Sequence, residues 1–202
     1  MIYTISYQQA STHFIDIELA VETEGDSQIQ FQLPAWRPGR YELGNFAKNI
    51  QKWQAFDENG NELSSKKLTK DLWEVDCEKT EKVIVKYNYF AFELNAGSTF
   101  LDENQLYVNP VNCLLYIPNR MNEACILNLI IPEDYQVAIS LPKADFAASS
   151  IVKNKFTIIR ESKLLFDPNI SKFFLKIILF FFLSCLFISK IASFIISVLF
   201  IL

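Results

Sequence analysis

The single histidine limits the chemistry that these side chains can perform. Zinc-assisted peptide hydrolysis needs about three protein ligands, an open position for water and a carboxylate base, and zinc peptidases often supply two of the ligands from a His-Glu-x-x-His helix. The chain offers only His13, so it cannot build that centre. A Ser-His-Asp or Cys-His triad would need the same imidazole, and no nucleophile-elbow pattern accompanies it. We therefore expect no catalytic residue, no bound metal and no enzyme activity from this chain.

The four cysteines give no second route to a metal centre. Cys77, Cys113, Cys125 and Cys185 show no C-x-x-C spacing, and Cys185 lies in a strongly apolar C-terminal stretch. Three widely spaced cysteines remain in the rest of the chain, an odd number that does not suit a disulfide framework. Free cysteine is among the most buried residue types, so we predict reduced, buried thiols.

Charge divides the 202-residue chain into two parts. Residues 151–202 hold 7 basic and 2 acidic side chains, a net charge of +5, whereas residues 1–150 hold 12 basic and 21 acidic ones, a net charge of −9. An acidic body with scattered arginines lacks the basic patch by which nucleic acids are bound. We exclude a nucleic-acid partner.

Apolar and polar residues alternate through most of the acidic body, the pattern of half-buried β-strands. The expected strands are residues 2–7, 14–21, 29–33, 72–75, 83–92, 105–108, 113–117, 124–131 and 135–141. Short strands at this spacing predict a mainly β, antiparallel, sandwich-like domain. Residues 57–61 contain Asn59-Gly60 and predict a hairpin turn. For residues 41–51, a helix and an irregular segment remain equally open.

Two stretches carry a resemblance to a known family. The first reads Leu-Pro-Ala-Trp-Arg-Pro-Gly-Arg-Tyr at residues 33–41 and Asn-Phe-Ala-Lys-Asn-Ile at 45–50. The second reads Tyr-Phe-Ala-Phe-Glu-Leu-Asn at 89–95 and continues through Thr-Phe-Leu-Asp at 99–102 to Leu-Leu-Tyr at 114–116. In this order they resemble the N-terminal domain of the glycyl aminopeptidase family, peptidase family M sixty-one, which is gluzincin-type and contains a PDZ domain.

The resemblance implies a role beside a catalytic domain. In gluzincins the β-rich N-terminal domain packs against the zinc-binding domain and helps to wall the substrate cleft, so zinc would belong to a catalytic domain that this chain lacks. The family's connection into that domain is not found after residue 148, which implies truncation. The candidate cleft residues are Asn95, Thr99, Asp102 and Asn109. The alternative is that these polar side chains only satisfy the backbone of a long connection.

The motif at residues 36–41 also has two readings. Arg37 and Arg40 could bind a carboxylate beside the aromatic side chains that flank them. The structural alternative, which we favour, is that Pro38-Gly39 forms a type II turn that needs the positive φ of glycine.

The C-terminal stretch has the length and apolarity of a membrane span, which needs about 20 apolar residues. We divide the chain into a β domain at 1–148, a connecting segment at 149–171 and a hydrophobic helix at 172–202 that is long enough to be transmembrane. Lysines precede the apolar run, so the body would face the cytoplasm. The change in composition after residue 150 is equally typical of an A/T-rich gene read out of frame, in which case the product would be cytoplasmic. No signal peptide is visible at the N-terminus.

Two functions remain open from the sequence. The chain is either the non-catalytic N-terminal domain of a metalloaminopeptidase-like protein, with a peptidase catalytic domain as its partner, or a membrane-anchored β-sandwich module that binds a peptide or protein at the cytoplasmic face.

Overall fold

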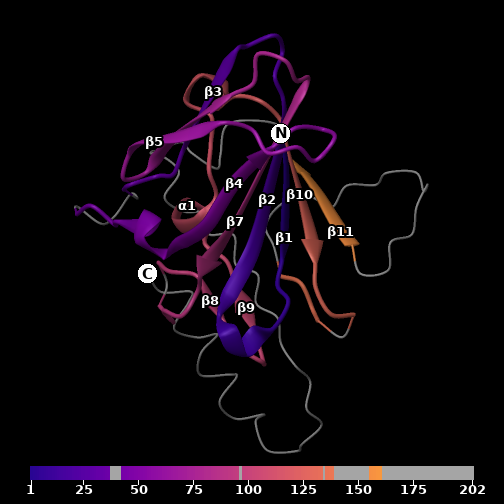
Figure 1. Cartoon of the computed structure of the whole chain (residues 1–202). Coiled ribbons are helices and arrows are strands. Elements are labelled where there is room, and N and C mark those ends of the chain that lie inside the picture. Colours follow the sequence, from indigo (N-terminus) through magenta and orange to yellow (C-terminus); the bar gives the residue numbers. More distant parts are fainter. Residues whose placement is uncertain (37–41, 96, 134, 139–154, 161–202) are drawn as a thin grey trace, which may run out of the picture.

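The fold is described by a computed structural model, which covers residues 1–36, 42–95, 97–133 and 135–138, and the backbone of 155–160. Its elements are β1 (Ile2–Ser6), η1 (Ala10–Thr12), β2 (Phe14–Glu22), β3 (Gln28–Gln32), η2 (Phe46–Asn49), β4 (Ile50–Phe56), β5 (Ser65–Thr69), β6 (Leu72–Asp76), β7 (Lys82–Phe90), β8 (Phe100–Leu101), β9 (Leu106–Tyr107), α1 (Pro110–Cys113), η3 (Pro118–Arg120), β10 (Cys125–Ile130) and β11 (Lys155–Arg160). The mainly β class predicted from the alternating pattern is confirmed (Figure 1).

A six-stranded sheet in the order β11-β10-β1-β2-β7-β4 forms the larger layer. Its neighbours are antiparallel except for β1 and β10, which run parallel with Ile2 beside Ile126 and Ile5 beside Leu129. The predicted antiparallel arrangement is wrong at this pair. Alternation in a sequence reports which face a side chain takes, and it contains no information on the direction of the neighbouring strand.

A second sheet in the order β3-β6-β5 lies above the larger one in Figure 1. Both sheets contribute to one continuous core: Ile17 and Leu19 of β2 belong to the same buried cluster as Phe31 of β3 and Val75 of β6. Trp53 of β4 stacks on Trp73 of β6 with 5.7 Å between ring centroids, which adds an aromatic contact between the sheets.

The hairpin turn predicted at Asn59-Gly60 is confirmed. Gly60 has a φ of +85°, a conformation that glycine adopts without strain. The Asp57 carboxylate accepts hydrogen bonds from the backbone N–H of Asn59 (2.9 Å) and Asn61 (2.8 Å) and from the Asn61 side chain (2.8 Å). These bonds, first among them that from the Asn61 side chain, lower the pKa of Asp57 because they stabilise the ionised form.

The structure decides the open choice for the described residues 42–51, and it differs from the strands predicted at 113–117 and 135–141, since the described residues 135–138 form no strand. In residues 42–51, only Phe46–Asn49 is helical, as a 3₁₀ turn, and β4 already begins at Ile50. The strand expected at 113–117 does not form as predicted. Helix α1 ends at Cys113, and within this range only Tyr116 pairs with another segment, in an isolated bridge to Gln32. Asn109 and Pro110 begin α1, because the Asn109 side chain accepts a hydrogen bond from Val111 N (3.3 Å) and proline suits the first helical position.

The C-terminal predictions fall largely outside the described residues. The helix predicted at 172–202 and the end of the β domain at 148 both lie there. Strand β11 lies within the segment predicted to be a connection, and it pairs along its whole length with β10. In the part of the chain that the structure describes, no helix is long and apolar enough to cross a membrane.

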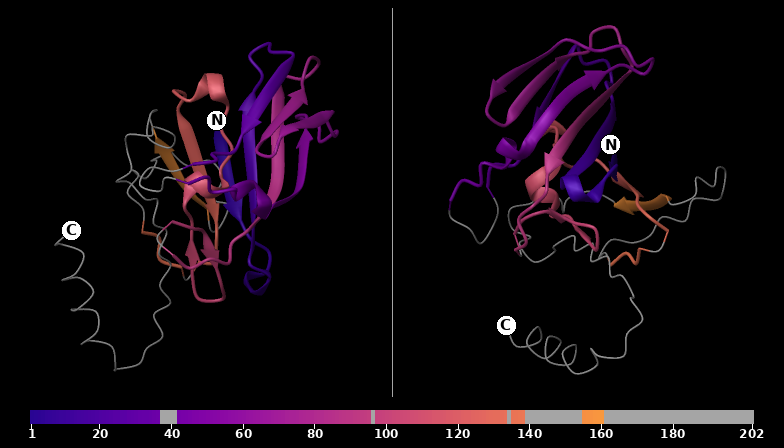
Figure 2. Two further views of the ribbon diagram at one scale, coloured as in Figure 1. Left: turned by 90° about the vertical axis from the view of Figure 1, so that its left-hand side faces the viewer. Right: turned by 60° about the horizontal axis from the view of Figure 1, so that its bottom comes forward.

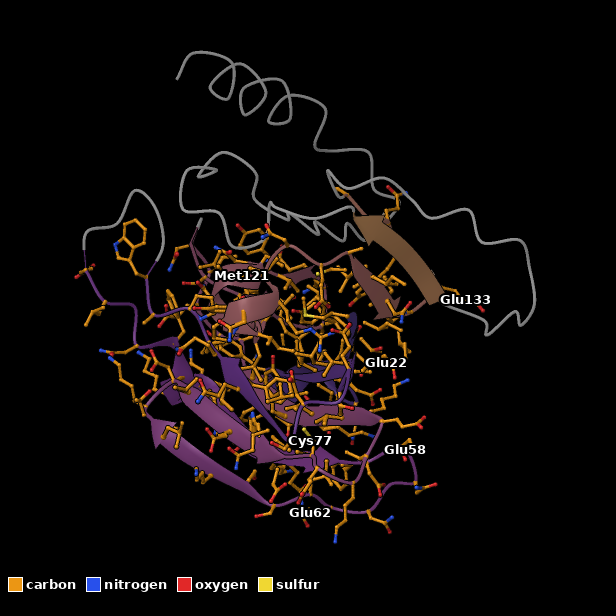
Figure 3. The ribbon with its side chains drawn as sticks, turned by 90° about the horizontal axis from the view of Figure 1, so that it is seen from above. Glu22, Glu58, Glu62, Cys77, Met121 and Glu133 are labelled. Atoms are coloured by element: carbon orange, nitrogen blue, oxygen red, sulfur yellow. The ribbon has the colours of Figure 1, made fainter. Side chains whose placement is uncertain are left out.

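The three cysteines of the described domain form no disulfide. Cys77 and Cys113 are buried, Cys125 is half-buried, and burial raises the pKa of Cys113 to about 12. In Figure 3, Cys77 lies among packed side chains, whereas Glu58 and Glu62 point outward at the rim.

Iodoacetamide at about pH 8 is expected to modify Cys125 more than about tenfold faster than Cys113 in the native chain, because alkylation needs an accessible thiolate. Peptide mapping by mass spectrometry measures both rates, and the two rates should converge in urea. Equal rates in the native chain would contradict the buried position of Cys113.

Candidate partner-binding site

The four candidate cleft residues lie in the segment that leads from β7 to α1. Asn95 is exposed and Asp102 is half-buried. The Asn95 side chain accepts hydrogen bonds from Gly97 N (2.9 Å) and Ser98 Oγ (3.1 Å), and Asp102 accepts from Asn104 N and Gln105 N (both 2.8 Å). Both side chains therefore close local turns of the segment.

Thr99 and Asn109 lie inside the fold, with 2% and 4% of their surface exposed. Asn109 N donates to Thr99 Oγ1 (3.2 Å), and the same hydroxyl lies 3.4 Å from the Asn109 carbonyl oxygen. Such burial leaves little of either side chain for a ligand to contact. The hydrogen bonds fit the alternative in which the polar residues of this segment satisfy its own backbone.

Two buried tyrosines, which the sequence analysis did not single out, hold the segment that follows α1 against the larger sheet. Tyr87 Oη donates to the Cys113 carbonyl (2.6 Å) and accepts from Leu115 N (3.3 Å), and Tyr3 Oη donates to the Leu115 carbonyl (2.8 Å). Burial raises the pKa of Tyr3 and of Tyr87 well above that of an exposed tyrosine. The hydroxyls stay protonated and act as fixed tethers.

A group of aromatic rings, two of them exposed, lies at the end of β7. We call His13, Phe14, Phe90, Phe92 and Phe100 the aromatic patch. The centroid of Phe92 lies 3.9 Å from that of His13 and 5.8 Å from that of Phe100, and Phe14 lies 5.1 Å from Phe90. Phe90 and Phe92 are 38% and 52% exposed. Large apolar side chains that cluster on a surface are typical of interaction sites.

Backbone and side-chain hydrogen bonds position the patch. His13 has a φ of +60° at the end of η1, and its Nδ1 lies 2.7 Å from the Leu101 carbonyl oxygen. Ala91 N donates to the His13 carbonyl (2.7 Å), and Leu101 N donates to the Ala91 carbonyl (2.8 Å). Figure 2 shows η1 near β8 and β9, at one end of the molecule. His13 is thus a structural member of the patch.

The chemistry open to this site is binding. Its rings offer apolar surface and one imidazole, and a single imidazole is a poor metal site. Within residues 1–36, 42–95, 97–133 and 135–138, no group of three or more His, Cys, Asp or Glu side chains is placed to hold a metal ion.

The predicted turn of Pro38 and Gly39 and the predicted anion contacts of Arg37 and Arg40 lie outside the described residues. The described chain resumes at Glu42, and Gly44 N donates a hydrogen bond to the Ala35 carbonyl (2.8 Å).

The described chain is a mainly β domain that exposes two aromatic rings, Phe90 and Phe92, at the end of β7. The chain belongs to the family of peptidase M61 N-terminal domains, which matches residues 2–164. The resemblance found in its motifs is thereby confirmed.

Solved structures include similar proteins. An aminopeptidase N family protein from Idiomarina loihiensis matches 80% of this chain with 26% identity and a TM-score of 0.69. The chain spans 27% of the length of that protein. An M1 zinc metallopeptidase from Deinococcus radiodurans matches 81% of this chain and 38% of its own, with 12% identity and a TM-score of 0.41. A search of curated proteins found no significant match.

Proposed function

We propose that this domain is non-catalytic and that its aromatic patch packs against the catalytic domain of a metallopeptidase, where residues 95–109 help to wall the substrate cleft. The zinc ion would be held by that catalytic partner, and this chain would carry no cofactor. The exposed pair Phe90 and Phe92 is the observation that carries the proposal.

Burial of these two rings would favour association. Removing apolar surface from water contributes about 25 cal/mol per Å², and aromatic residues are enriched among the side chains that dominate binding energies. The patch is also continuous with the candidate cleft segment, because Phe92 pairs with Phe100 in an isolated bridge and Phe100 lies between Asn95 and Asn109. A partner that covers the patch would therefore lie beside the segment.

The family and its relatives support the identity of the partner. The family is defined as the N-terminal domain of a peptidase, and the similar Idiomarina loihiensis protein is named as an aminopeptidase N family member and is several times longer than the matched region. A domain that is part of a larger peptidase needs a surface for the remaining domains.

The test measures binding of the full chain to the Idiomarina loihiensis protein from which the matching region has been deleted. Isothermal titration calorimetry should detect association, and Phe92→Ser should weaken it by about tenfold or more, because a central aromatic anchor contributes about 2 kcal/mol or more. The matched control is Met121→Ser, since Met121 is 44% exposed and precedes β10 at the opposite end of the sheet.

Two results would contradict the proposal. Equal affinity of Phe92→Ser and Met121→Ser would remove the aromatic patch from the interface. Peptide turnover by the purified chain with added zinc, abolished by a chelator, would show that the domain is itself catalytic. The alternative of a membrane-anchored binding module depends on residues 172–202, which lie outside the described part.

A further inference from the structure

A cavity of about 390 Å³ lies away from the aromatic patch, between Pro34 and Ala35, η2 and the β5–β6 hairpin. Its volume falls within the range of about 300–1,000 Å³ that is usual for ligand sites. Lys48, Lys67 and Lys70 line it together with one acidic residue, Asp71. The lining therefore has a net charge of +2, on a body whose residues 1–150 carry −9.

None of the three lysines has a carboxylate partner within 4.0 Å in the described part of the chain. The ion pairs found there use other lysines, Lys66, Lys82 and Lys86. Asp71 lines the same cavity, but its carboxylate accepts a hydrogen bond from Thr69 Oγ1 (2.8 Å). Asp71 therefore offsets one of the three positive charges, and among the described residues no ion pair neutralises the other two.

Neutral contacts position two of the ammonium groups. Lys70 Nζ donates to Asn45 Oδ1 (2.5 Å), which connects the β5–β6 turn to the residue that begins η2. Lys67 Nζ lies 4.7 Å from the ring centroid of Trp73. Contacts of this kind hold a cation in place and leave its charge able to attract an anion.

Apart from Asn45, the remaining wall is apolar. Pro34, Ala35, Phe46 and Ala47 contribute to the lining, and neither proline nor the three hydrocarbon side chains offers a polar group. A ligand that fills the cavity must therefore present an apolar body to this wall and a negative charge to the lysines.

We propose that this cavity binds a carboxylate attached to an apolar group. The C-terminus of a peptide and a small free organic acid share this chemistry. Inorganic phosphate would satisfy the lysines and leave the apolar wall without contacts, so it fits less well. The inference rests on the cavity and not on the aromatic patch, and it stands independently of the proposed peptidase role.

Isothermal titration calorimetry of the full chain with N-acetyl-leucine at low salt tests the site. The expected dissociation constant is about 1 mM, since lysine–carboxylate pairs at a surface are individually weak. The neutral N-acetyl-leucinamide should bind about tenfold more weakly or not at all. Raising the salt from about 0.01 to 0.1 M shortens the screening length from about 30 to 10 Å, and the affinity for the acid should fall.

The variant that tests the residues is Lys67→Met with Lys70→Met, which removes both charges and keeps most of each side chain. It should weaken N-acetyl-leucine binding about tenfold, because both charge contacts to the carboxylate are lost and each is weak at an exposed site. Lys79→Met is the control, because Lys79 is exposed and does not line the cavity. Thermal unfolding checks that all the variants remain folded.

Four results would overturn the proposal: no binding of N-acetyl-leucine at about 10 mM, equal binding of its amide, equal or tighter binding of phosphate, or equal affinities of the double variant and Lys79→Met. The tripeptide N-acetyl-Ala-Ala-Leu separates the two sources of carboxylate. Tighter binding than N-acetyl-leucine supports peptide termini, and equal or weaker binding supports small acids.

Discussion

Replacing Tyr87 with phenylalanine is expected to lower the free energy of unfolding by about 2–4 kcal/mol. The Tyr87 hydroxyl is the hydrogen-bond partner of both the Cys113 carbonyl (2.6 Å) and the Leu115 N–H (3.3 Å), and the side chain is only 3% exposed. Leaving a buried polar group without a partner costs about 1–3 kcal/mol, and here two groups lose theirs. Urea unfolding followed by circular dichroism measures the difference.

Tyr89→Phe is the matched control on the same strand. Tyr89 is also buried, but within the described residues its hydroxyl accepts a single hydrogen bond, from the half-buried Asn49 side chain (3.1 Å). Water can reach this side chain after the substitution. We expect a loss of about 0.5–1.5 kcal/mol. Equal losses for the two variants would show that the tether from β7 to the segment after α1 contributes no more than an ordinary hydrogen bond.

Prediction from the sequence succeeded where the local pattern determines the structure. The alternating residues of β2 and β7 place one side chain in the core and the next outside, and both strands were expected within two residues of their observed bounds. The Asn59-Gly60 turn was predictable because its positive φ favours glycine. These features depend on residues close together in the chain.

Elements without such a pattern were missed. All five residues of β5 are exposed, so its sequence does not alternate between apolar and polar residues. The segment is a strand because its backbone pairs with that of β6. In β4, Lys52 has a φ of +52° and the register with β7 shifts between Gln51 and Gln54, so the period of two is interrupted. Propensity alone does not reveal strands that depend on their neighbours.

The candidate sites also depend on contacts between distant residues, which the local sequence pattern does not reveal. Polarity suggested Thr99 and Asn109 as cleft residues, but polarity does not distinguish a side chain that meets a ligand from one that bonds to its own segment. Phe90 and Phe92 were recognised only as part of a strand, because their contact with His13 joins residues nearly 80 positions apart. The lysine-lined cavity likewise combines η2 with β5 and the turn after it, and no spacing in the sequence indicates it.

The second large effect is expected at Asn112, which is 1% exposed. Its Nδ2 donates to the Gly97 carbonyl (2.5 Å), and its Oδ1 is buried without a hydrogen-bond partner in the described part of the chain. Asn112→Asp keeps the shape of the side chain but, when ionised, turns an acceptor toward the Gly97 carbonyl and buries an unpaired charge. We expect a loss of about 3–4 kcal/mol of unfolding free energy at pH 7, since linkage to an unfolded pKa of about 3.9 allows about 1.4 kcal/mol per pH unit.

The loss of unfolding free energy caused by Asn112→Asp should increase as the pH rises. Burial without a partner raises the folded-state pKa of the new carboxyl above its unfolded value of about 3.9. Below about pH 4 the protonated carboxyl can donate to Gly97 as the amide does, so the variant should approach the parent chain. The deficit then grows as the pH rises above the unfolded pKa, and it levels off above the folded one.

Urea unfolding of the variant and the parent at matched pH values measures this deficit, and Asn95→Asp is the control. Asn95 is exposed and its side chain serves as an acceptor, for Gly97 N and Ser98 Oγ, a role that a carboxylate keeps. Its substitution should change the unfolding free energy by no more than about 0.5 kcal/mol. A loss at Asn112 that is the same at pH 4 and pH 7 would arise from shape rather than charge, and would refute an unpaired charge as its cause.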